Sequence, residues 1–340
     1  MYVPRPSTRR RANPHNRHDR GVRRVLPSHG AGLGVGLRVA LPRPRFLDRI
    51  EVCDVIVIVG CLVVIGAIVA GFTWAGGHLM ALVHPSEIVT IGGASLGALI
   101  VMSPKKVLVD LFKGVLQAVK GSPFSKAMYA DLFKLMYDLL RTARREGLLG
   151  LEVHVSHPHD STIFAKYPRV AKNHHVTDFI CSGLTPLVEG TARKEQLPAL
   201  FAADLHVIEE EHHLPLIALS KTADALPGFG IVAAVLGIVI TMGHIDGPVE
   251  EIGEKVGAAL VGTFLGILLS YGFFAPMAGR MELMGFAEIG FFKTIATIIT
   301  GFANELPPKV AIDQARRGVG SEMRPTREEL EEIFKEVDAS

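Results

Sequence analysis

Three groups of histidines are the side chains of this sequence most suited to chemistry, because imidazole binds metals and carries protons near neutral pH. They are His154, His157 and His159; His174 and His175; and His206, His212 and His213. No cysteine pairs with them, no HExxH motif occurs, and Pro158 interrupts the first group. A Walker loop, a GxSxG motif and a strand-linked GxGxxG motif are also missing. We therefore interpret the histidines as solvated, and we predict no metal site, no cofactor and no enzyme.

The polar groups inside the long apolar stretches are hydroxyls, namely those of Thr90, Ser95, Thr241, Thr263, Ser270 and Tyr271. None of these stretches contains Asp, Glu, Lys, Arg or His, so they hold no proton relay of their own. If ions cross a membrane here, a partner must donate the titratable residue. Pro227 lies at the start of the third apolar stretch and Pro276 near the end of the fourth, where each either loosens its helix by removing a hydrogen bond or simply terminates it.

A small charged group, Arg144, Arg145 and Glu152, has two interpretations. It is either an ordinary ion-paired helix end, which adds little stability when exposed, or a face for a docking protein. In the second case complementary charges set the register and the association rate of the complex.

The elements that must carry these residues are membrane helices. The chain has 340 residues, of which 49% are hydrophobic and 21% charged, and its mean hydropathy is +0.32. This content excludes disorder of the whole chain, and three cysteines do not make a disulfide framework. About 20 residues cross a hydrocarbon core of ~30 Å. The sequence therefore predicts four spans, at the uncharged windows 55–77, 88–104, 225–243 and 256–279.

Charge fixes the orientation of these spans. Residues 105–224 hold 15 Lys or Arg and residues 280–340 hold 8, whereas the loops 78–87 and 244–255 hold only Lys255. The positive-inside rule places both long polar segments, and both termini, in the cytoplasm. We predict an all-α membrane protein with four transmembrane helices, a helical cytoplasmic domain between spans 2 and 3, and a cytoplasmic C-terminal tail. Its parts are a leader (1–54), spans 1–2 (55–104), a cytoplasmic domain (105–224), spans 3–4 (225–280) and C-terminal helices (281–340).

The leader has a composition of its own, with 12 Arg, no Lys and 4 acids in residues 1–54. We expect it to be disordered by itself. It is an arm for nucleic acid or anionic lipid, a targeting peptide, or the product of a start codon assigned too early. The last interpretation, with translation beginning near Val55, is favoured. No nucleic acid is expected as a partner.

Hydrophobic periodicity predicts three helices outside the spans. One covers 123–146 with an apolar face, and a second covers 197–222, where Pro215 interrupts the pattern. The third covers 326–338 and begins with a capping box formed by Thr326 and Glu329. In the spans, glycines recur at small-xxx-small spacing, which favours a packed bundle and an oligomer.

Several segments carry a family resemblance. LPGFGIVAAVLG (226–237) and LVGTFLGILLSYGFFA (260–275) resemble the third and fourth spans of the flagellar motor stator subunits of the MotA/TolQ/ExbB proton channel family. GLLGLE (147–152), STIFAKYPRV (161–170) and SEMRPTREELEEI (321–333) agree in order and spacing, so the resemblance covers 55–338. It implies a stator subunit in which five copies surround a dimer of a single-span, MotB-like partner that carries a membrane aspartate, in the bacterial inner membrane.

The resemblance also implies roles for individual residues. Thr263 lines the channel with Ala234 near it, and Ala234 favours protons over sodium. Pro227 and Pro276 couple conformational change to proton passage, and Arg144 and Glu152 face the rotor protein FliG. Which of Arg141, Arg144 and Arg145 docks best stays open, because the charges around Arg144 differ from the family pattern. The alternatives are an ExbB/TolQ-type energiser of outer-membrane transport, which usually has three spans, and a membrane scaffold that conducts nothing.

Overall fold

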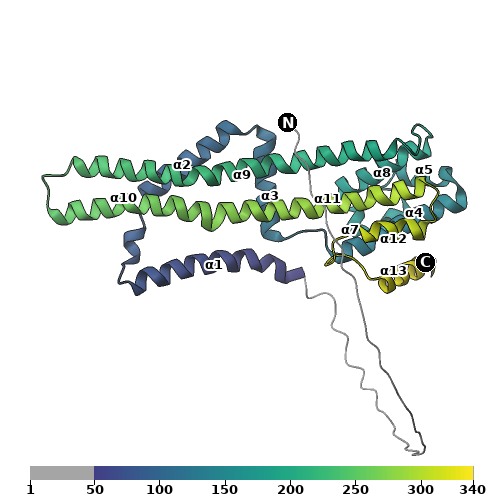
Figure 1. The fold of residues 1–340 in the computed structure, drawn as a ribbon, viewed down its shortest axis with the longest axis horizontal. Helices are drawn as coiled ribbons and strands as arrows, with labels where there is room; N and C mark the ends of the chain where they lie inside the picture. Colours follow the sequence, from purple (N-terminus) through teal and green to yellow (C-terminus); the bar gives the residue numbers. More distant parts are fainter. Residues whose placement is uncertain (1–49, 340) are drawn as a thin grey trace, which may run out of the picture. The chain divides into compact units, whose positions relative to one another are not determined.

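The computed structural model describes residues 50–339 and, among these, the side chains from Ile56 onwards. The predicted leader lies outside this range except for its last residues, 50–54, which form the start of helix α1 (Ile50–Trp74). The described chain folds into helices alone (Figure 1). After α1 these are η2 (Leu79–Leu82), α2 (Pro85–Met102), α3 (Lys105–Lys120), α4 (Lys126–Glu146), α5 (Leu148–Ser156), α6 (Thr162–Lys166), α7 (Pro168–Ala171), α8 (His174–Val188), α9 (Leu197–Met242), α10 (Val249–Leu269), η3 (Ser270–Phe274), α11 (Ala275–Ala303), α12 (Pro308–Arg317) and α13 (Arg327–Ala339).

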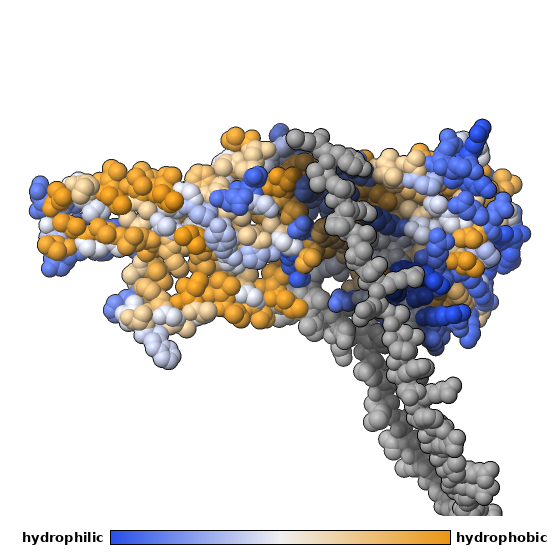
Figure 2. Space-filling model, in the orientation of Figure 1, coloured by the Kyte–Doolittle hydropathy of each residue, from blue (hydrophilic) through white to orange (hydrophobic). Residues whose placement is uncertain are grey.

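Four helical segments of the described chain are long and apolar enough to cross a membrane, which confirms the predicted number of spans. They lie in Ile56–Trp74, Leu79–Met102, Leu197–Met242 and Val249–Ala303. Large apolar side chains cover the outer surfaces of these segments, and Figure 2 shows this apolar surface over α1 and over the parts of α9 and α10 near the turn that joins them. Lipid is the solvent that such a surface requires, because contact with water would be unfavourable over so large an area.

Helix α9 runs without a break through 46 residues, a length of about 69 Å at ~1.5 Å per residue. The predicted helix at 197–222 is confirmed as the first part of α9. Pro215 interrupts the hydrophobic pattern but not the helix, since both Pro215 and Pro227 lie inside α9. Each proline removes one backbone donor. Packing offsets this cost, because Pro215 is buried and α9 lies against α2, α3, α10 and α11.

The chain returns beside α9 through α10, η3 and α11, which continue one another from Val249 to Ala303. The connecting segment η3 is a π-helix, in which the N–H of Ala275 donates to the carbonyl of Ser270 five residues earlier. Pro276 follows directly, in the first turn of α11. The hydrogen-bond pattern of the helix therefore changes directly before the proline, which itself lacks a backbone donor. Both π turns and prolines are common causes of kinks in α-helices.

The remaining helices build what we call the polar helical domain: α4 to α8, the C-terminal half of α11, α12 and α13. Its apolar core holds Leu132 and Phe133 of α4, and it also takes in α11, whose Phe291 meets Tyr129 at 4.9 Å between ring centroids. The predicted helices at 123–146 and 326–338 are confirmed as α4 and α13. The capping box is present: the N–H of Thr326 donates to Glu329 Oε2 at 2.8 Å, and the N–H of Glu329 to Thr326 Oγ1 at 3.2 Å.

Candidate functional sites

The contact between α9 and α10 is made by glycines. A methyl group added at Gly230 would lie 2.8 Å from the carbonyl oxygen of Gly262 and 3.2 Å from the Cα of Gly266. One added at Gly266 would lie 2.6 Å from the carbonyl oxygen of Leu226. These are backbone atoms, which do not rotate away as a side chain does. The two helices therefore approach backbone to backbone, as small residues permit in membranes.

The predicted channel residues flank this contact. Thr263 follows Gly262 on α10, and its backbone lies 3.3 Å from the position of a methyl at Gly230. Ala234 lies one turn beyond Gly230 on α9, next to Ala233, which packs against Gly262. Both side chains are half-buried. Thr263 differs from Thr222 and Thr241, whose hydroxyls donate to carbonyls of their own helix at 2.8 Å, because its hydroxyl has no hydrogen bond within residues 50–339. Its hydroxyl is thus free for another group.

The two predicted coupling prolines lie on two helices that pack against each other, Pro227 on α9 and Pro276 on α11. Pro227 follows Leu226, whose carbonyl oxygen meets Gly266, so a change of the α9 backbone here alters the contact with α10 directly. Pro276 follows the π-helix in the other long helix. Each proline therefore lies where a weakened backbone can move one helix against the other.

Arg144 and Glu152 lie on either side of the α4–α5 turn, which Gly147 makes with a φ of +80°. Both side chains are exposed. Arg144 is engaged within the chain, because its Nη2 donates to the carbonyls of Glu305 at 2.7 Å and Leu306 at 3.1 Å, and its guanidinium lies 5.8 Å from the Phe302 ring centroid. Glu305 is the one described non-glycine residue with positive φ, +66°. Arg144 thus fastens the α11–α12 turn to the end of α4.

The neighbouring arginines differ from Arg144. Arg141 binds buried Asp138 at 3.1 Å and also donates to the carbonyl of Val337 at 2.9 Å, so it links α4 to α13. Arg145 is exposed and has no ion pair or hydrogen bond with any described residue. Of these three arginines, Arg145 is the one most available to a partner, and Arg141 is the one most committed to the fold.

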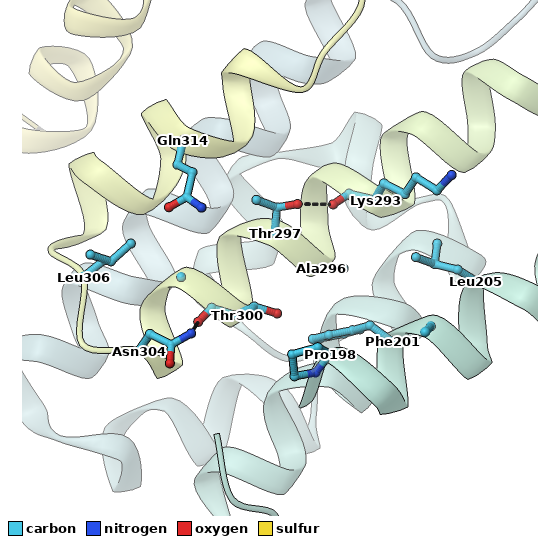
Figure 3. A pocket seen from close by; sticks show the side chains of 12 residues that line it. Pro198, Phe201, Leu205, Lys293, Ala296, Thr297, Thr300, Asn304, Leu306 and Gln314 are labelled. Carbon is cyan, nitrogen blue, oxygen red and sulfur yellow. Dashed lines mark hydrogen bonds between the residues drawn. The ribbon is translucent and has the colours of Figure 1, made fainter. Parts of the chain in front are cut away.

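A groove adjoins the turn that Arg144 holds, with a volume of about 440 Å³. It is bounded by the start of α9, by the end of α11 and by α12. Figure 3 shows Pro198 and Phe201 of α9 on one side of the groove, and Lys293 of α11 and Gln314 of α12 elsewhere around it. Two of its polar side chains are occupied by their own helix: Thr297 Oγ1 donates to the Lys293 carbonyl at 2.8 Å, and Asn304 Nδ2 donates to the Thr300 carbonyl at 2.9 Å. Of the remaining polar side chains that line the groove, those of Lys293, Thr300 and Gln314 have no hydrogen bond within the described chain.

The histidines are spread over the surface, and no three metal-binding side chains of the described chain lie together. His212 of α9 pairs with Glu288 of α11 at 3.0 Å. Glu288 accepts a hydrogen bond from the imidazole and thereby raises the pKa of His212, and the charges of Glu211 and Asp110 add to the effect. His212 therefore joins the two long helices most strongly when it is protonated.

One polar group was missed by the sequence analysis. Glu87 belongs to the predicted loop 78–87, yet it is buried in the first turn of α2 against Gly262. The signal that could have indicated this is Pro85, a residue typical of the first position of a helix, because it places Glu87 within the helix and not before it.

Comparison with known proteins defines the class. The family model of the MotA/TolQ/ExbB proton channel family matches residues 171–285, and that of the motility protein A N-terminal region matches residues 58–147. The chain therefore belongs to the MotA/TolQ/ExbB proton channel family and is a membrane protein, as the resemblance implied.

Its relatives narrow the class to the motility branch. The chain is 36% identical over 282 residues to Motility protein A of Salmonella typhimurium, covering 83% of this chain and 96% of the relative. It is 35% identical over 279 residues to the chemotaxis protein LafT of Vibrio parahaemolyticus, covering 82% and 98%. Two solved structures share the fold. C. jejuni MotAB has a TM-score of 0.67 at 19% identity, with 81% of this chain and 99% of that chain covered, and the Bacillus subtilis flagellar MotAB stator complex has 0.60 at 22%, with 76% and 92% covered.

Proposed function

We propose that this chain is a stator subunit of the bacterial flagellar motor, which couples proton flow across the inner membrane to torque on the rotor. The observation that carries the proposal is the 36% identity to a motility protein A over nearly the whole relative. The relatives with motility and chemotaxis names favour this function over an ExbB/TolQ-type energiser. We expect no catalysis by the chain.

The chain conducts only together with a single-span, MotB-like subunit whose membrane aspartate takes up the proton. The likeness to MotAB complexes supports such a partner. The free hydroxyl of Thr263 offers a hydrogen bond to that aspartate in either protonation state, and the small side chain of Ala234 leaves room beside it. A charge that crosses 100 mV releases about 2.3 kcal/mol. Protonation of a carboxylate changes the free energy of burying it by several kcal/mol. One proton can therefore drive a modest rearrangement of α9 against α10.

The partners and the placement follow the same proposal. The polar helical domain and both termini lie in the cytoplasm, because segments rich in Lys and Arg stay on the cytoplasmic side of a membrane. Five copies of the chain surround the partner dimer, and the glycine contacts between helices suit such a bundle. The α4–α5 turn meets the rotor protein FliG, and its charges set the register of that contact.

The docking assignment is tested by charge reversal. Arg145→Glu should lower motility and leave the melting temperature unchanged, since Arg145 is exposed and has no ion pair or hydrogen bond within the described chain. Arg144→Glu should lower both, because it also releases the carbonyls of Glu305 and Leu306. Lys335→Glu, an exposed reversal on α13, serves as control. Reversal of a rotor acid should partly restore motility, and failure of every such reversal would remove the assignment.

The function as a whole is tested by complementation. The full chain is expressed with its MotB-like partner in a strain that lacks its own stator, and swimming speed is measured while sodium is varied at a fixed proton gradient. We expect swimming that does not depend on sodium. No swimming with both subunits correctly inserted would refute the stator function, and a requirement for sodium would refute the assignment of the ion.

A further inference from the structure

A buried carboxylate that the scheme above does not use lies in the first turn of α2. Glu87 is 7% exposed, and its Oε2 has no hydrogen-bond partner among residues 50–339. An ionised carboxylate in such a place costs several kcal/mol unless it is paired. The Oε2 atom of Glu87 is therefore a buried acceptor that no described residue uses.

Glycine makes the space for this carboxylate. A methyl group at Gly262 of α10 would lie 2.5 Å from Glu87 Oε2 and 3.1 Å from the methyl of Ala233 on α9. One turn deeper in α2, fully buried Ile91 packs with Leu226 and Ala233 of α9. The carboxylate thus lies where α2, α9 and α10 meet, and apolar side chains close the space behind it.

Access from the loops at this end is open. A cavity of about 720 Å³ lies between α1, η2 and the first half of α10, and His84 and Glu254 are its polar lining residues. His84 caps α2, its carbonyl accepts the N–H of Glu87 at 3.1 Å, and its Nδ1 is buried without a described partner. The cavity is otherwise lined by apolar residues and glycines, and its His84 lies one helical turn before the buried acceptor.

The charged groups around the site are few. Helix α10 brings Glu254 and also Lys255, which pairs with Glu251 at 3.4 Å. Helix α9 contributes no charged or titratable side chain in 225–243, and α1 contributes no charged side chain in 55–77. Glu254 is therefore the one charged side chain of the described chain that lines the cavity.

We propose that Glu87 is a proton-loading site at the outer mouth of the channel. Its carboxylate accepts a proton that enters through the cavity past His84, and becomes a carboxylic acid. It then gives the proton to the carboxylate of the partner's aspartate and returns to the ionised form. The inference rests on the proposed function. Glu87 is then a titratable group of this chain on the proton path. It increases the rate of proton uptake when protons are scarce.

The test is proton flux through the purified complex with its partner, in vesicles of phosphatidylcholine and phosphatidylglycerol that contain a pH-sensitive dye. Glu87→Gln keeps the shape and removes the proton acceptor, and Glu332→Gln, an exposed change on α13, is the matched control. At alkaline outer pH we expect the flux through Glu87→Gln to fall about 10²-fold, the lower end of what a positioned proton-transferring side chain contributes. At acidic outer pH we expect the flux to approach that of the wild type, and Glu87→Asp should retain most of it at either pH.

The outcomes separate the two proposals. A wild-type complex that conducts no protons refutes the proposed function. A wild-type complex that conducts, with Glu87→Gln equal to it across the pH range, refutes the loading site alone. Because Glu87→Gln could fail to assemble, the wild-type complex is also treated with dicyclohexylcarbodiimide, which modifies protonated carboxyl groups in apolar surroundings. Mass spectrometry should find the adduct on Glu87, and absence of that adduct would overturn the inference.

Discussion

Replacement of Gly266 by alanine should drive α9 and α10 apart. The added methyl would lie 2.6 Å from the carbonyl oxygen of Leu226 and 2.9 Å from the Cα of Gly230, whereas ordinary contacts begin near 3.4 Å. The helices must therefore separate by about 0.8 Å, because neither backbone atom can rotate away. Overpacking of this kind typically costs about 1–3 kcal/mol. A domain of 150–250 residues loses ~2–4 °C of melting temperature per kcal/mol, so we expect a decrease of about 2–12 °C.

The assay is thermal unfolding of the purified protein in detergent, followed by loss of the monodisperse peak in gel filtration. Gly228→Ala and Gly279→Ala are matched controls, because a methyl at either position meets no atom within 4 Å in the described chain. Alanine also has the higher helix propensity, by about 1 kcal/mol, so these controls should melt at the wild-type temperature or above. A Gly266→Ala protein as stable as Gly228→Ala would refute the backbone contact.

Three further predictions concern other parts of the chain. Pro227→Ala and Pro276→Ala should each leave assembly intact and abolish torque, which tethered-cell rotation would measure; normal rotation in either variant would argue against coupling through the prolines. The ion pair of His212 with Glu288 should stabilise the protein by up to about 1 kcal/mol below the usual histidine pKa and lose this contribution as pH rises through the raised pKa of His212. The wild type should therefore melt above His212→Gln near pH 6 and equally near pH 9, and an equal difference at both would contradict this pairing. Thr326→Ala should cost about 1 kcal/mol by removing the cap of α13, and unchanged thermal unfolding would show that packing alone holds that helix.

The sequence was sufficient where a single physical pattern decides the structure. An uncharged window of about 20 residues has few alternatives to a membrane helix, so the four spans follow from composition. Helix α4 follows from its apolar face, and α13 from a capping box that acts within four residues. These are local properties, and a single chain displays them.

The sequence was not sufficient where packing outweighs a local cost. Pro215 reads as a helix breaker, but its burial within the helix pair offsets one lost hydrogen bond, so α9 continues. The burial of Glu87 depends on Gly262, which is 175 positions away in the sequence and brings no side chain to the contact. The difference between Arg144 and Arg145 depends on the carbonyls of the α11–α12 turn, which no local pattern indicates.

The passage of α11 from the apolar region into the core of the polar helical domain has a mechanical consequence. Its 29 residues form a lever about 44 Å long that begins directly after the π turn. A bend of about 10° at that turn would swing the other end by roughly 8 Å, simply from the length of the helix. A displacement of atomic size beside the membrane is thereby amplified to the size of a side chain or more, with no loop in between to absorb it.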